Sequence, residues 1–188
     1  MKRALKWIGG ILATLVLVTV LGFAWTIYRF NKALEPIESI DQYQEVLADW
    51  KESGLVDHFP GSLSAHARNV KFSSFPGFLQ GGGHVQIRME LPEEEVKTLY
   101  DRATQSAKQH QDGGNSVTLV NERDDGLWST HPHTLAKGTY EFPSDYRIFI
   151  FDAKPYRKGS GHDWNHGESK GMVVSLQRNE VLYYAENW

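Results

Sequence analysis

The stretch from residue 159 to residue 171 gathers the side chains best suited to chemistry, and it reads GSGHDWNHGESKG. Two histidines, two acidic residues, a tryptophan and an asparagine lie among four glycines. Binding residues concentrate on loops that a rigid scaffold holds in place. We therefore predict a loop that binds a ligand or partner, with the candidate residues Asp163, Trp164, Asn165, His166 and Glu168.

A metal-dependent hydrolase is the alternative for the same loop. Zinc hydrolysis needs about three protein ligands and an open position for water. The ligands would be His162, His166 and Glu168, with Asp163 as a base or an orienting partner. Two histidines four residues apart share one face only in a helix, and glycines disfavour a helix here. No metal or other cofactor is therefore expected.

A purely structural role for the loop is the third hypothesis. Asp163 and Asn165 are residue types that bond their own backbone in turns, and Trp164 can cover a sheet edge. Serine nucleophile chemistry is not favoured, because Gly159-Ser160-Gly161 is expected to form only a flexible turn. Paired-carboxylate glycosidase chemistry stays open, because any two acids can meet in a fold.

Composition narrows the classes of function. The chain has 188 residues and no cysteine, so disulfides and thiolate catalysis are excluded. Residues 31–188 carry 16 basic and 23 acidic side chains, a net charge of −7. Because nucleic-acid binding requires a basic surface, no nucleic-acid partner is expected.

Residues 7–28 predict a membrane anchor. They contain no charged side chain, and Lys2, Arg3 and Lys6 precede them. As a helix they would rise about 33 Å, enough to cross a hydrocarbon core of about 30 Å.

The positive-inside rule places the N-terminus in the cytoplasm and the remaining domain outside a bacterial cell membrane. A cleavable signal peptide, with Gly22-Phe23-Ala24 as the cleavage site, is the alternative. We expect a signal anchor over residues 1–30 and one extracytoplasmic domain over residues 31–188.

The first half of the outer domain predicts two helices and two strands. Tyr43, Val46, Leu47 and Trp50 form one apolar stripe of a helix that Ser39–Gln42 would cap and Gly54 would end. Strands are expected over residues 70–75 and 84–90, the second with alternating apolar and polar faces. Pro92 and the following three glutamates begin the second helix.

The second half predicts strands only. They cover residues 116–120, 146–151, 172–176 and 181–185, with the strand over 146–151 central and the last two paired around Arg178-Asn179. His58, beside Phe59 and Pro60, is expected to pack rather than to bind a ligand. The elements together predict an α+β domain with a mostly antiparallel sheet and two helices.

Four segments resemble a group of small bacterial membrane-anchored or exported proteins of uncharacterised function. They are HFPG at 58–61, PGFLQGGG at 76–83, WNHGESKG at 164–171 and RNEVLYYAENW at 178–188. The resemblance covers most of the outer domain and implies a single compact domain, but no activity. The leading hypothesis is a non-enzymatic, membrane-tethered domain that binds an envelope protein or ligand.

Overall fold

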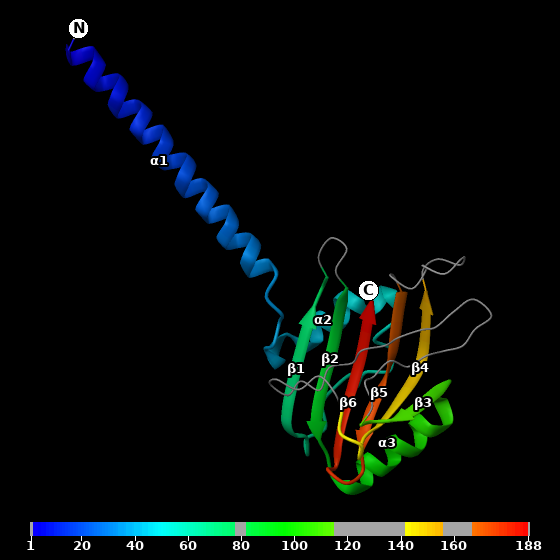
Figure 1. The fold of residues 1–188 in the computed structure, drawn as a ribbon. Coiled ribbons are helices and arrows are strands. Elements are labelled where there is room, and N and C mark those ends of the chain that lie inside the picture. The colour runs from blue at the N-terminus through cyan, green and yellow to red at the C-terminus, as the bar shows by residue number, and fades with distance from the viewer. Residues whose placement is uncertain (1, 78–81, 115–141, 156–166, 188) are drawn as a thin grey trace. The chain divides into compact units, whose positions relative to one another are not determined.

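The computed structural model describes residues 2–77, 82–114, 142–155 and 167–187 (Figure 1). Over these ranges the chain is α+β, with three α-helices and one six-stranded sheet. Two compact units make up the chain, Met1–Glu35 and Pro36–Trp188.

The first unit is helix α1, Lys2–Ala33. It ends shortly before Pro36, which lacks the amide hydrogen that a helix interior needs. The large apolar side chains described between residues 15 and 30 are 43–68% exposed. Within the described ranges, no helix is both long and apolar enough to cross a membrane.

The second unit is built on an antiparallel sheet in the order β1-β2-β6-β5-β4-β3 (Figure 1). All neighbouring strands run antiparallel. Strand β6 pairs with β2 on one side and with β5 on the other, so it lies inside the sheet. The strands are β1 (Arg68–Phe75), β2 (Gly83–Glu90), β3 (Gln109–Asp112), β4 (Arg147–Pro155), β5 (Gly167–Ser175) and β6 (Glu180–Asn187).

Both helices of this unit cover the same face of the sheet. Helix α2 (Tyr43–Trp50) lies between the short 3-10 helices η1 (Ile40–Gln42) and η2 (Lys51–Ser53), and α3 is Glu93–Ser106. The ring of Tyr43 meets that of Phe72 edge to face at 5.6 Å. The main core lies between these helices and the sheet, and it includes Val46, Phe59, Val85, Ile87, Met89, Val96, Ala103, Phe149, Met172 and Tyr183.

The opposite face of the sheet carries a second apolar cluster. It consists of Phe142, Tyr146, Ile148, Ile150, Val173, Leu182 and Tyr184. Strands β4, β5 and β6 therefore bury side chains on both faces. This explains their nearly continuous apolar runs in the sequence.

Several predicted elements are confirmed. The stripe of Tyr43, Val46, Leu47 and Trp50 lies on α2 and packs on the core. The C-terminal hairpin turns at Asn179, whose φ of 54° is the left-handed conformation that asparagine tolerates. Gly54 ends η2 with a φ of 69°, as a helix-ending glycine should.

Other predictions were wrong. The strand predicted over 146–151 is not central, because β5 and β6 occupy the middle of the sheet. Ser39 makes no side-chain capping bond. The predicted loop ends earlier than Gly171, since β5 begins at Gly167 and pairs with β4 and β6. Strand β3 was missed, and the strand predicted over 116–120 lies outside the described residues.

Candidate functional site

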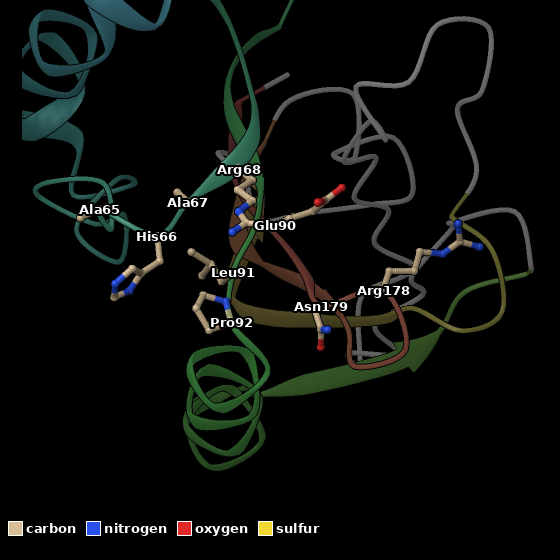
Figure 2. Close-up of a pocket in the computed structure, with 9 residues that line it drawn as sticks. All are labelled: Ala65, His66, Ala67, Arg68, Glu90, Leu91, Pro92, Arg178 and Asn179. Carbon is tan, nitrogen blue, oxygen red and sulfur yellow. The ribbon is translucent and has the colours of Figure 1, made fainter.

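Two adjoining cavities mark the end of the sheet where β1 begins and β2 ends. The larger, called here the end cavity, has a volume of about 550 Å³ (Figure 2). His66 and Arg178 lie at its opposite ends (Figure 2). It is lined by Ala65, His66, Ala67, Arg68, Glu90, Leu91, Pro92, Arg178 and Asn179.

The second, called here the strand cavity, has a volume of about 420 Å³. It shares Glu90 with the end cavity, and Asn69 in its wall directly follows Arg68 of the other. Both volumes fall within the range of roughly 300–1,000 Å³ typical of ligand sites. The strand cavity is lined by Asn69, Val70, Lys71, Arg88, Glu90 and Glu180.

A β-bulge in β1 shapes the junction of the two cavities. Arg68 pairs with Glu90 and Lys71 with Arg88, so β1 has one more residue here than β2. Asn69 adopts a φ of 49° and its Nδ2 donates to Glu90 Oε1 at 2.8 Å. Asparagine suits this position because its short polar side chain tolerates the left-handed conformation and bonds locally.

Backbone and ion-pair contacts hold the turn at the base of the end cavity. The amide of Leu91 donates to the carbonyl of Asn179 at 2.9 Å. Arg178 binds Asp145 through Nε at 2.7 Å and Nη2 at 3.1 Å, a two-point contact. The Arg178 hydrogen bond lowers the pKa of the Asp145 carboxyl. This carboxylate is ionised at neutral pH and ties the β5–β6 turn to the segment before β4.

A buried polar triad forms one wall of the strand cavity. Arg88 Nη2 donates to Glu180 Oε2 at 2.6 Å, and the Tyr146 hydroxyl donates to Glu180 Oε1. The Glu180 side chain is only 8% exposed. Burial, followed by the adjacent Glu180 carboxylate, raises the pKa of the Tyr146 hydroxyl. The tyrosine therefore stays a neutral donor, and the wall is fixed in place.

Two cations at these cavities form no ion pair with any described residue. They are Arg68 in the end cavity and Lys71 in the strand cavity, and both are exposed. Lys71 also stands directly opposite Arg88 on β2. Like charges in directly opposed positions destabilise a sheet.

The polar side of β2 continues away from the cavities as a buried surface. His84 Nε2 lies 3.0 Å from Ser73 Oγ, and Ser169 Oγ donates to Glu186 Oε1 at 2.7 Å. Gln86 is 0% exposed, and neither its Nε2 nor its Oε1 has a hydrogen-bond partner among the described residues. The alternation of β2 was predicted correctly, but its polar face is largely covered.

Of the site residues predicted from the sequence, the structure describes only Glu168. It lies on β5, 14% exposed, and its Oε1 is 2.5 Å from Lys154 Nζ on β4. Asp163, Trp164, Asn165 and His166 lie outside the described residues, as does His162 of the alternative metal set. Among the described residues, no group of three or more histidine and acidic side chains could hold a metal. All three hypotheses for the loop stay predictions.

No sequence pattern singled out the residues that line the two cavities. The strand register that places Lys71 opposite Arg88 cannot be read from the sequence. The bulge between Arg68 and Lys71 contains no glycine or proline that would indicate it. The one indication of the cavities in the sequence was the charged end of the alternating segment 84–90.

Comparison with known proteins adds no assignment: no protein-family model, curated protein or solved structure matches this chain.

Proposed function

We propose that this protein is a membrane-tethered binding domain whose outer unit holds a protein partner or ligand of the cell envelope in the two adjoining cavities. The observation that carries the proposal is the junction of the end and strand cavities at Glu90. A concave site with a few convergent polar groups is the usual form of a ligand site.

The tether rests on residues 7–28 and their flanking charges. No charged residue interrupts this stretch, and basic residues precede it. The described apolar side chains of α1 are largely exposed, and water disfavours such a surface. Fractionation with alkaline washing tests the tether, because a spanning helix keeps the protein in the membrane pellet and a cleaved or peripheral protein is released.

The binding role is supported by the rigid construction of the cavity walls. Glu180 and Asp145 each hold an arginine by short hydrogen bonds, so the lining side chains are ordered before any ligand arrives. Preorganised sites lose less conformational entropy on binding. Arg68 and Lys71 are in contrast not engaged in ion pairs with described residues and can contact a ligand.

Affinity capture of the full-length protein in detergent tests this role. Three proteins are compared: the unchanged chain, the double variant Arg68→Ala with Lys71→Ala, and the control Lys97→Ala on the exposed surface of α3. The proposal predicts a molecule that the unchanged chain and the control retain and the double variant loses. Equal retention by all three proteins would contradict it.

A further inference from the structure

We propose that the adjoining cavities recognise an acidic peptide segment in which two carboxylates occupy alternate positions of an extended chain. This inference rests on the proposed binding function and specifies its ligand. The segment would place one carboxylate beside Arg68 in the end cavity and the other beside Lys71 in the strand cavity.

The charge balance around the cavities favours an acidic ligand. Glu90 and Glu180 are the two acids that line them, and Glu180 binds Arg88; the lining Arg178 binds Asp145. Among the lining residues, Arg68 and Lys71 remain as two positive charges against the single carboxylate of Glu90. The site is thus locally positive within an acidic domain, which favours an acidic partner.

The pairing of β1 with β2 places two like charges opposite each other. Lys71 faces Arg88 directly, and Arg88 is fixed by its bond to Glu180. Directly opposed like charges destabilise a sheet. A carboxylate bound beside Lys71 would relieve this repulsion, so the pair is better suited to a complex than to the free protein.

The spacing of the two cations matches alternate positions of an extended peptide. The register partners of Arg68 and Lys71 are Glu90 and Arg88, which are two residues apart on β2. Two residues of a strand span about 7 Å, and side chains at positions i and i+2 of an extended peptide point the same way with the same spacing. A peptide with acids at alternate positions matches the two cations, whereas adjacent acids would point to opposite sides.

Glu90 is the group that opposes such a ligand. Its carboxylate accepts a hydrogen bond from Asn69, and Figure 2 shows the side chains of Glu90 and Arg68 extending in different directions. Arg68 is therefore not neutralised by its own register partner. Removing the charge of Glu90 should strengthen binding, an effect that general damage to the fold would not produce.

Fluorescence anisotropy with the full-length protein in detergent micelles tests the inference. The probes are three dye-labelled glycine–serine peptides of equal length, one with two aspartates at alternate positions, one with two adjacent aspartates, and one with asparagines at the alternate positions. The alternate-aspartate peptide should bind tightest. Exposed ion pairs contribute about 0.2–1 kcal/mol, so Arg68→Ala or Lys71→Ala should each weaken its binding by up to about fivefold.

The variant Glu90→Gln should strengthen binding of the same peptide by a similar factor, while Lys97→Ala should leave it unchanged. Equal binding of the three peptides, no response to Arg68→Ala and Lys71→Ala, or no binding at millimolar peptide would overturn the inference. If the capture experiment still retains a cavity-dependent molecule in that case, the binding function stands and only the ligand class is wrong.

Discussion

Arg88 and Glu180 join strands β2 and β6 through a hydrogen bond of 2.6 Å on the face of the sheet opposite the helices. Their strands pair along their whole length, but these two residues lie on a diagonal, because Arg88 is opposite Leu182 and Glu180 is opposite Glu90. The pair places two opposite charges on this face of the sheet and fixes the wall of the strand cavity.

The variant Glu180→Ala should lower the free energy of unfolding by about 3 kcal/mol, because it leaves the largely buried Arg88 guanidinium without its carboxylate. Urea unfolding followed by tryptophan fluorescence measures the change. Glu94→Ala on the exposed first turn of α3 is the control and should stay within about 0.5 kcal/mol of the unchanged protein. A Glu180 variant as stable as this control would show that the pair contributes no structural free energy.

Gly171 should not tolerate a side chain. A Cβ at this position would overlap the carbonyl oxygen of Phe149 and the hydroxyl of Tyr184. The variant Gly171→Ala should therefore lower the free energy of unfolding by about 1–3 kcal/mol, the usual cost of overpacking. Gly61→Ala is the matched control, since its Cβ would meet no atom within 4 Å. Equal melting temperatures for the two variants would refute this packing.

His58 should make the protein sensitive to acid. Its Nε2 lies 2.9 Å from the carbonyl oxygen of Gly171, its Nδ1 is buried without a partner among the described residues, and the rings of Phe59 and Phe151 pack against it. Burial lowers the pKa of the imidazole from 6.5 to about 4. The confirmed packing role of His58 thus has a consequence for stability.

The direction of the pH effect follows from which state binds the proton first. Between pH 6.5 and 4, His58 is protonated in the unfolded protein but stays neutral in the folded protein. The stabilisation is therefore fully present above pH 6.5 and is lost as the pH is lowered toward 4. The full loss is roughly 3 kcal/mol. In urea unfolding across this range, His58→Gln should reduce the loss, whereas His66→Gln at an exposed position should not. Identical pH profiles for the unchanged protein and His58→Gln would count against the buried neutral imidazole.

Replacing Gln86 by an apolar side chain of similar shape should make the protein more stable. Neither polar atom of the buried Gln86 amide has a hydrogen-bond partner among the described residues. A buried amide without partners costs about 1–3 kcal/mol, and an apolar replacement removes this cost. We expect Gln86→Met to raise the free energy of unfolding by about 1 kcal/mol, measured by urea titration. A decrease of similar size would mean that the amide is hydrogen-bonded in solution.

The sequence predicted the elements whose pattern is local. The stripe on α2, the alternation of β2 and the turn at Asn179 were identified because helix periodicity, strand alternation and turn chemistry act over a few residues. The α+β class followed from the same patterns.

The long-range pairing of the strands could not be predicted from the sequence. Nothing near Lys71 indicates that Arg88 will stand opposite it, because register depends on strands that meet only in the folded sheet. Gly171 resembled a loop glycine in the sequence. It lies in β5 instead, where the absence of a side chain lets Tyr184 approach closely. The short polar strand β3 has no apolar alternation, so its pairing with β4 decides its conformation.

Site-specific photo-crosslinking tests the central claim, that the adjoining cavities are the binding site, most directly. A photoreactive amino acid is placed at Val70 in the strand cavity or at Lys97 on α3, and the full-length protein is irradiated in the membranes of cells that naturally produce it. Binding in the cavities predicts one discrete adduct from position 70 and none from position 97, and loss of that adduct in the Arg68→Ala, Lys71→Ala background. Adducts of equal yield from both positions, or an adduct from position 70 that survives the double substitution, would contradict it.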